Sequence, residues 1–412
     1  MTLTTAVAPH APEVRQERPG WTLAGWLLLA VAIATAVATV MLDVSHRSYG
    51  VGDDFDVFRA AGAAVLNGES PYDFSLDRGF MFIYTPFAAI CLIPLTLFGA
   101  DLALGVWTLI SLLAMAAVIW ISLRSAGVES RRRRATVTLV IAIVALPLTP
   151  VLLNLWLGQI NIVLMFLIMA DLSRRSGRYR GIGVGIAAGI KLTPLIFIGY
   201  LLITRQFRAA RTAAATFLGT VLIGFYVLPE ASWHYWGGMF LDTSRMFPVG
   251  ADQIWNQSLR GIVAIHFAAD PHERLIWLAL CVAVGAFGLM VARSANTRGN
   301  EVAAIVACGV TGALLSPLSW TPHWVWWVPL LAMVTGHAVK AARRGAPAGA
   351  TAVWLAFSAQ SYFWVYWILT GRPAWPDPSP ALLTHLVVLT GLAVLGVLGA
   401  LAVSRRASAR PT

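Results

Sequence analysis

Charged residues are scarce in this sequence. Only 12% of the 412 residues are Asp, Glu, Lys or Arg, whereas 58% are hydrophobic. Soluble globular chains carry roughly twice that share of charge, so the composition excludes an ordinary soluble protein and indicates an integral membrane protein. Stretches of about ten residues with alternating polarity, the pattern of a membrane β-barrel, are also missing. We therefore predict an all-α membrane protein.

Cysteine is scarce as well. Cys91, Cys281 and Cys308 all lie inside apolar runs, without the paired Cys or Cys/His spacing of a metal site. We interpret them as small apolar packing residues, so neither a disulfide nor a zinc site is predicted.

Basic residues exceed acidic ones, and the formal net charge is +11. They are not spread along one face between aromatic residues, as a nucleic-acid surface would require, and no nucleic-acid partner is predicted. They gather instead in short loops between apolar runs, which the positive-inside rule assigns to the cytoplasm. These loops are 124–134, 174–180, 205–211, 340–344 and the pair beginning at Arg405.

Apolar runs of about 20 residues, the length that crosses a bilayer as a helix, recur along the chain. We predict one polytopic domain over 21–403, between cytoplasmic tails at 1–20 and 404–412, with outer loops near 42–80, 230–274 and 371–381. The fold should have about 10–12 transmembrane helices. The expected uninterrupted crossings are 21–43, 101–123, 135–153, 158–172, 212–229, 275–293, 301–318, 323–339, 351–369 and 382–403.

Two further apolar runs are expected to be broken or re-entrant. Pro86 and Pro94 interrupt 80–99, and Lys191 and Pro194 interrupt 181–203. Irregular backbone at membrane depth is tolerated where it lines a cavity, so both breaks are predicted to face a site. An ionisable residue inside a membrane segment is itself a functional candidate, and a cation beside a helix end suits a phosphate. The alternative is that Lys191 extends to a lipid head group.

The first outer loop holds seven of the nineteen acidic residues, three of them in "VGDDFDVFRAAG" (51–62). The motif of Asp54 and Asp56 resembles a D-x-D metal site, but hard cations need more converging oxygens than these two residues supply. In an extended chain Asp53 would oppose the other two, and in a helix all three would fan out. In either case one carboxylate is expected to point inward. A solvated loop without function is the alternative.

Other polar residues stand at the mouths of apolar runs. Pro86 has the position of a first helical residue, behind Tyr84. Gln159 and Asn161 must be paired inside apolar sequence, either with neighbouring helices or with sugar hydroxyls. In the second outer loop, Arg260 is placed to clamp a phosphate or to close a helix. Asn256 and Gln257 precede it, and Trp320 and Trp324 flank His323, where aromatic rings bind sugars or anchor the membrane interface.

Six ordered stretches together resemble the polyprenol-phosphate-mannose-dependent mannosyltransferases of glycosyltransferase family 87, which belong to the GT-C class. Among them, the α-1,2-mannosyltransferases of phosphatidylinositol mannosides are most similar. The resemblance implies a multi-helix GT-C fold in the plasma membrane, with its active site on the periplasmic or outer face beneath the first outer loop. The stretches are "DDFDVF", "IYTPFAAICLIPL", "GQINIVLM", "GIAAGIKLTP", "WNQSLRG" and "LLSPLSWTPHWVWWVPL".

The resemblance implies roles for particular residues that match the family's motifs. The family pattern D-[LF]-x-V-[YF] places its catalytic carboxylate at Asp54. The family's Tyr-Pro-Pro stands here as Tyr84-Thr85-Pro86. Its Ser-Trp-x-His-His-Trp begins here at Ser319, with Pro322 in place of the first histidine and His323 in place of the second.

The resemblance implies inverting transfer of mannose from polyprenyl-phosphate-mannose to the 2-OH of a mannosylated glycolipid, among membrane lipids and without a cofactor or metal. Asp54 is the expected general base, with His323 as a second catalytic residue; Lys191 and Arg260 are the expected phosphate ligands. Alternatives within the family are a lipomannan-branching mannosyltransferase and an arabinosyltransferase; a lipid or sugar transporter is a remoter one. No oligomeric state follows from the sequence. The expected substrate-binding residues are Tyr84, Gln159, Asn161, Asn256, Gln257, Trp320 and Trp324.

Overall fold

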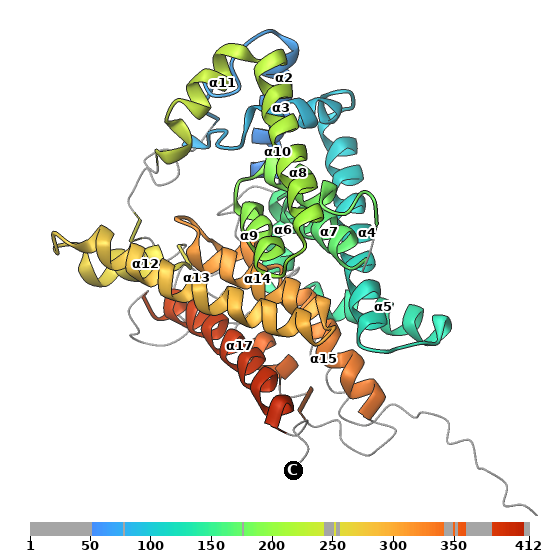
Figure 1. Ribbon diagram of the computed structural model, residues 1–412. Helices are drawn as coiled ribbons and strands as arrows, with labels where there is room; N and C mark the ends of the chain where they lie inside the picture. Colours follow the sequence, from blue (N-terminus) through green and yellow to red (C-terminus); the bar gives the residue numbers. More distant parts are fainter. Residues whose placement is uncertain are drawn as a thin grey trace, which may run out of the picture.

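The computed structural model describes residues 52–76, 79–174, 177–242, 251–252, 256–341, 349–350, 353–359 and 381–407. Within these ranges every regular element is a helix, which confirms the all-α prediction (Figure 1). The predicted crossing at 21–43, most of that at 351–369, the third outer loop and the N-terminal tail lie outside the described residues.

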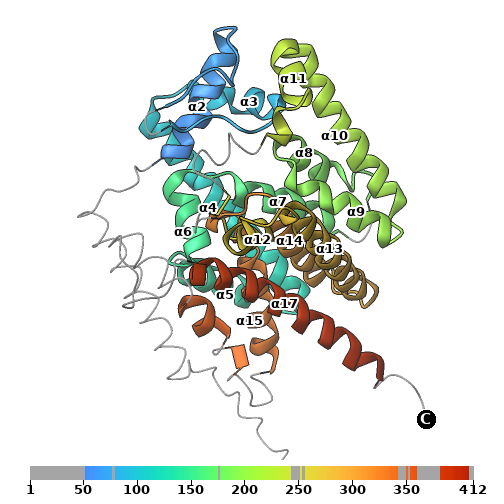
Figure 2. The same ribbon diagram turned by 90° about the vertical axis from the view of Figure 1, so that its left-hand side faces the viewer.

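The first half of the described chain contains short helices around the longer α4. In order they are α2 (Asp53–Leu66), α3 (Pro86–Leu92), η2 (Ile93–Thr96), α4 (Ala100–Ser125), α5 (Arg131–Ala145), α6 (Thr149–Leu157), α7 (Asn161–Leu172), α8 (Ile182–Ile190), η3 (Thr193–Leu195) and α9 (Ile196–Ile203). The second half contains α10 (Phe207–Val227), α11 (Pro229–Trp236), η4 (Met239–Leu241), α12 (Leu259–Phe267), α13 (Glu273–Thr297), α14 (Glu301–Leu315), η6 (Thr321–Trp324), α15 (Trp327–Ala341) and α17 (Ala381–Ala407). Both ribbon views place α2, α3 and α11 at one end of the molecule, with α15 and α17 toward the other (Figures 1 and 2).

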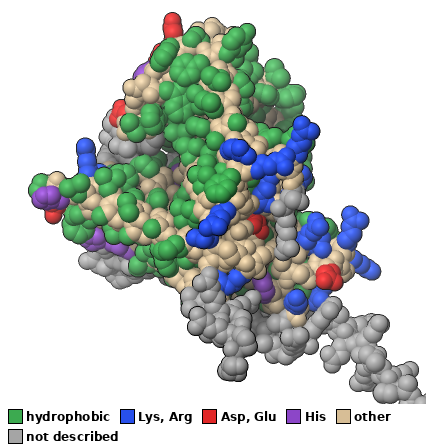
Figure 3. Space-filling view, in the orientation of Figure 1, with side chains coloured by type: hydrophobic (Ala, Val, Ile, Leu, Met, Phe, Trp, Pro, Cys, Tyr) green, Lys and Arg blue, Asp and Glu red, His purple; other side chains and the backbone are tan. Residues whose placement is uncertain are grey.

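Three helices of the described chain, α4, α10 and α13, are long and apolar enough to cross a membrane. They carry exposed large hydrophobic side chains, as lipid-facing helices must, and hydrophobic side chains cover much of the face in Figure 3, with basic side chains gathered along one side of it. The expected total of 10–12 crossings stays a prediction. Shorter apolar helices cover 86–96, 161–172, 193–203, 301–315 and 385–401.

The predicted uninterrupted crossing at 135–153 is wrong. The structure ends α5 at Ala145 and begins α6 at Thr149, with a bend of 79° between the two helices. Pro147 lies in the break, and proline both lacks an N–H donor and clashes with the preceding turn of a helix. Pro150 is tolerated because it stands near the start of α6, where no intrahelical donor is needed.

Neither of the two apolar runs expected to be interrupted forms one long helix in the structure. Pro86 is at the first turn of α3, and the buried hydroxyl of Thr85 caps that helix by accepting from the Ala88 N–H at 3.1 Å. In the second segment, α8 ends at Ile190, and Lys191 is extended with φ −141° and ψ 135° before η3 begins. Pro194 lies within η3. The lysine therefore occupies irregular backbone between two short helices.

The end of α8 that carries Lys191 is held tightly by its neighbours. A side chain at Gly189 would collide with Thr220 of α10, so only glycine allows the two helices to approach this closely. The Thr85 hydroxyl also donates to the Gly189 carbonyl, which links α8 to the start of α3. The position of Lys191 follows from this close packing of α8 against α3 and α10.

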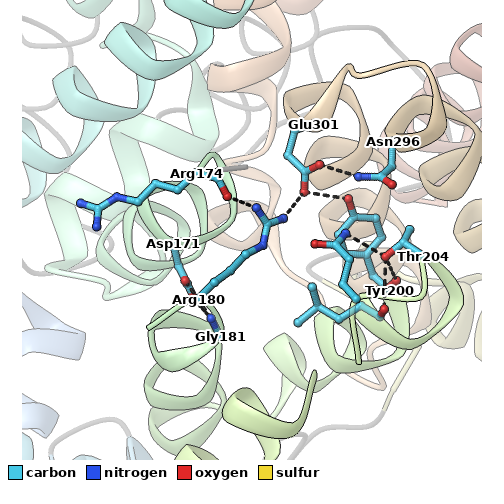
Figure 4. Close-up of polar contacts among 10 residues, drawn as sticks. Asp171, Arg174, Arg180, Gly181, Tyr200, Thr204, Asn296 and Glu301 are labelled. Atoms are coloured by element: carbon cyan, nitrogen blue, oxygen red, sulfur yellow. Dashed lines mark hydrogen bonds and ion pairs between the residues drawn. The ribbon is translucent and has the colours of Figure 1, made fainter. Parts of the chain in front are cut away.

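A partly buried polar cluster holds the start of α8 and the C-terminal half of α9 (Figure 4). Glu301, at the start of α14, accepts from Arg180 at 2.8 Å and from the Tyr200 hydroxyl at 2.9 Å. Asn296 of α13 donates to its other oxygen at 2.5 Å. Asp171 of α7 accepts from the Gly181 and Val184 N–H groups and so caps α8. Together these contacts connect α7, α8, α9, α13 and α14.

Candidate active site

The carboxylates of Asp54 and Asp56, both in the first turn of α2, have different surroundings. Asp56 is exposed, whereas Phe55 and Phe58 are buried in the core. Asp54 accepts a hydrogen bond from the Gln159 side chain. Its Oδ2 atom is buried, and none of the described residues gives that oxygen a hydrogen bond. Asp54 is thus enclosed and Asp56 is not, and a single inward carboxylate among the three stays a prediction.

The start of α2 is positioned by the turn between α6 and α7. Gly158 has a positive φ of 71°, and a side chain there would contact the Phe55 Cβ at 2.6 Å. The Trp107 indole of α4 donates to the Gly158 carbonyl at 2.8 Å, and the Gly52 N–H donates to the Trp156 carbonyl at 2.9 Å. These contacts set the residue after Gly158, which is Gln159, beside Asp54.

A continuous polar network leads away from Asp54 through the interior. The Gln159 Oε1 atom accepts from the Tyr84 hydroxyl at 3.3 Å and from the Asn161 Nδ2 at 3.2 Å. The Asn161 Oδ1 accepts from the Lys191 Nζ at 3.0 Å, and Nζ lies 2.8 Å from the His323 Nε2. The Lys191 ammonium also lies 5.2 Å from the centre of the Tyr84 ring, within reach of a cation–π interaction. Six sequence-predicted site residues therefore meet in one network.

The environment adjusts the protonation of the two ends of this network. Burial raises the pKa of Asp54 to about 6, although the Gln159 hydrogen bond and the charge of Lys191 oppose the rise. Near pH 7 the carboxylate is therefore mostly ionised and able to accept a proton. His323 also bonds to the Leu318 carbonyl. Since its Nε2 faces an ammonium donor, this geometry selects a neutral imidazole with its proton on Nδ1.

A small cavity of about 50 Å³ adjoins the end of the network that Lys191 and His323 form. Lys191, His323 and Asn161 form its polar wall, while Phe197 and Trp326 contribute to its apolar wall. A site with a cationic side and an apolar side suits an amphipathic ligand that carries a negative head and a hydrocarbon chain.

Asn256 and Gln257 lie outside this network and are fully buried. The Asn256 side chain bonds the Pro317 carbonyl and the Ser319 N–H, at 3.1 and 3.2 Å. The Gln257 Nε2 donates to the Thr321 hydroxyl at 2.9 Å. The structure thus places both carboxamides as braces for the segment that precedes His323.

Arg260, Trp320 and Trp324 are also separate from the polar network. Arg260 forms an ion pair with Glu273 of α13, and its guanidinium lies 5.5 Å from the centre of the Trp277 ring. Trp324 is wholly buried and stacks on Trp327 with ring centres 5.2 Å apart. Trp320 is partly buried. These contacts give Arg260 and Trp324 structural partners within the chain.

Sequence reasoning missed one residue of the site, Asn154. This buried carboxamide accepts from the Asn161 Nδ2 at 3.3 Å and donates to the Pro322 carbonyl at 2.7 Å. It also donates to the Pro150 carbonyl of its own helix at 2.6 Å. The sequence pattern that identified Gln159 and Asn161 also applies to Asn154, because a carboxamide inside an apolar run must be paired.

An enclosed carboxylate is joined by a polar network to a Lys–His pair inside an apolar helical protein, and this arrangement suits a membrane enzyme with acid–base chemistry. Residues 82–317 match the model of glycosyltransferase family 87. The chain belongs to this family and is a glycosyltransferase, which confirms the sequence resemblance.

Curated relatives agree with the family match. One is the polyprenol-phosphate-mannose-dependent alpha-(1-2)-phosphatidylinositol mannoside mannosyltransferase of Mycobacterium tuberculosis, 31% identical over 346 residues, which are 79% of each chain. Another is the corresponding phosphatidylinositol pentamannoside mannosyltransferase of Mycolicibacterium smegmatis, 30% identical over 390 residues, which are 93% of this chain and 92% of the relative. No solved structure matches the chain.

Proposed function

We propose that this enzyme transfers mannose from polyprenyl-phosphate-mannose to the 2-OH of a mannosylated glycolipid of the phosphatidylinositol mannoside type. The observation that carries the proposal is the buried Oδ2 of Asp54, which no described residue hydrogen-bonds, at one end of a network that ends in Lys191 and His323. The names of the relatives support the donor and the kind of acceptor.

Asp54 is the general base in this proposal. Its free oxygen accepts the proton of the acceptor 2-OH while that hydroxyl oxygen bonds to the anomeric carbon of the donor mannose. The bond from this carbon to the phosphate oxygen breaks on the opposite face, so a β-linked donor gives an α-mannoside. One base is sufficient for this single displacement, and a pKa of about 6 leaves Asp54 ionised to perform it.

Lys191 and His323 receive the departing polyprenyl phosphate. Asn161 and His323 take two of the three N–H bonds of the Lys191 ammonium, so the third can point to a phosphate oxygen. A cation held in a low-dielectric site stabilises developing negative charge more strongly than it would in water. The lysine thereby assists departure of the phosphate, and the neutral histidine keeps the ammonium oriented.

The remaining site residues divide between donor and acceptor. Tyr84, Gln159 and Asn161 line the path between Asp54 and Lys191, where hydroxyls of the mannose would lie. The apolar wall of the cavity beside Lys191 suits the first part of the polyprenyl chain. We place the site at the outer face of the plasma membrane, because the basic loops are expected on the cytoplasmic side.

The test is product analysis with the purified enzyme in liposomes. Labelled polyprenyl-phosphate-mannose and a phosphatidylinositol mannoside should give a labelled glycolipid, and linkage analysis should identify an α-1,2-mannoside. A pentosylated product made only from decaprenyl-phosphate arabinose would show that the donor sugar is arabinose instead of mannose. Movement of lipid between leaflets without any new glycosidic bond would contradict the enzymatic proposal.

A further inference from the structure

The polar contacts around Lys191 and His323 form a closed ring. Lys191 bonds Asn161, Asn161 bonds Asn154, Asn154 bonds the Pro322 carbonyl, and Pro322 is joined covalently to His323, which returns to Lys191. The noncovalent steps measure 3.0, 3.3, 2.7 and 2.8 Å in that order. The ring includes residues from α6, α7, η6 and the break after α8.

Asn154 closes this ring with a single side chain. Its amide group donates to two carbonyls, those of Pro322 and Pro150, while its oxygen accepts from Asn161. Asn154 is 1% exposed, so its side chain depends on these partners instead of bulk water. Aspartate would direct oxygens at two carbonyls, and an aliphatic residue would remove the donor to the Pro322 carbonyl. Among the common side chains, asparagine matches this combination of donors, acceptor and length.

We infer that Asn154 is a positioning residue that sets the location of His323 relative to Lys191, and thereby shapes the phosphate site. The inference rests on the proposed function of that pair. Pro322 has no N–H of its own, so its carbonyl is the backbone hydrogen-bonding group through which this residue can be held. Misplacement of a catalytic group by about 1 Å can reduce a rate by about a hundredfold. Loss of the hydrogen bond from Asn154 to Pro322 should therefore lower kcat/KM for the donor.

The variant Asn154→Ser removes the contacts to Pro322 and Asn161 but can keep the one to Pro150. A serine hydroxyl can still donate to the carbonyl four residues earlier, which is Pro150, but it is too short to reach η6. We expect kcat/KM for polyprenyl-phosphate-mannose to fall about tenfold or more, with KM for the mannosylated acceptor nearly unchanged. Asn300→Ser is the matched control, because Asn300 caps α14 through the Ala303 N–H and has no contact with the ring. This control should leave donor kinetics unaltered.

A double-mutant cycle with His323→Gln separates positioning from loss of stability. If Asn154 acts through His323, Asn154→Ser should change donor kcat/KM by less than about twofold in the His323→Gln background. If its effect is independent of His323, the fold-changes of the two single variants should multiply in the double variant. Full multiplication, or an equal effect on donor and acceptor, would overturn the inference. If His323→Gln alone leaves donor use intact, the proposed role of His323 fails first. Tryptophan fluorescence during heating verifies that each variant is folded.

Discussion

The Nζ atom of Lys191 and the Nε2 atom of His323 lie 2.8 Å apart, although 132 positions separate the two residues in the chain. The first stands in the break after α8, and the second stands in η6 after α14. In the proposed function their contact forms the phosphate end of the site, and the Asp54 carboxylate lies at the other end of the network. The two ends are bridged by Gln159 and Asn161.

Lys191→Gln should impair use of the lipid donor. A charge-assisted hydrogen bond contributes about 1.5–3 kcal/mol, so its loss from a phosphate site predicts at least a tenfold fall in kcat/KM for polyprenyl-phosphate-mannose. Arg260→Gln is the matched comparison, since Arg260 is already paired with Glu273. It should change donor kcat/KM less than about threefold. Steady-state kinetics at varied donor concentration check both. A larger effect from Arg260→Gln would make Arg260 the phosphate ligand.

The rate should depend on the ionisation of Asp54. With a pKa near 6, kcat/KM should rise between about pH 5 and pH 7, because only the ionised carboxylate accepts the proton. Gln159→Leu should move this rise to higher pH, since it removes a hydrogen bond that lowers the pKa. Initial rates in buffered liposomes measure the profile. If kcat/KM stays constant from pH 5 to pH 7, Asp54 is not the general base.

Asp54→Asn should make the protein more stable at neutral pH. The folded-state pKa of about 6 exceeds the unfolded value near 4, so ionisation opposes folding. This cost develops between about pH 4 and pH 7 and reaches about 3 kcal/mol above that range. The variant should therefore melt at a higher temperature than the wild type at pH 7.5 and at a similar one at pH 4. Asp56→Asn, at an exposed position, should change little at either pH.

The melting comparison in detergent also distinguishes a functional residue from a structural one. If the carboxylate supports folding, its neutralisation should lower the stability of the protein. If it serves chemistry instead, its neutralisation should raise that stability. Lower thermal stability of Asp54→Asn at pH 7.5 would show that its charge supports the fold.

Local features of the fold could be predicted from the sequence where proline and glycine decide the backbone. The breaks at Pro86 and Pro194 were predicted for that reason, since a missing donor acts within one turn. The bend between α5 and α6 was missed because the apolar run is long enough for one crossing, although Pro147 is a signal that could have revealed it. Apolar length alone does not distinguish a straight helix from two short ones.

The candidate site could be predicted in its residue types but not in its pairings. Lys191, Gln159 and Asn161 were identified because polar groups are costly inside apolar sequence. The same cost applies whether the partner is a substrate or another helix, so sequence could not separate the network residues from Asn256 and Gln257. Those two brace the loop before His323, and only long-range contacts reveal the difference.

The central claim is that Asp54 alone among the three carboxylates of α2 is the base. The most direct measurement is mannosyl transfer by Asp54→Asn, Asp53→Asn and Asp56→Asn, each purified and supplied with polyprenyl-phosphate-mannose and a phosphatidylinositol mannoside. Removal of a general base predicts a fall of about 10²- to 10⁴-fold in kcat for Asp54→Asn only, with KM for the donor nearly unchanged. Near wild-type transfer by Asp54→Asn, or an equal loss in all three variants, would contradict the account.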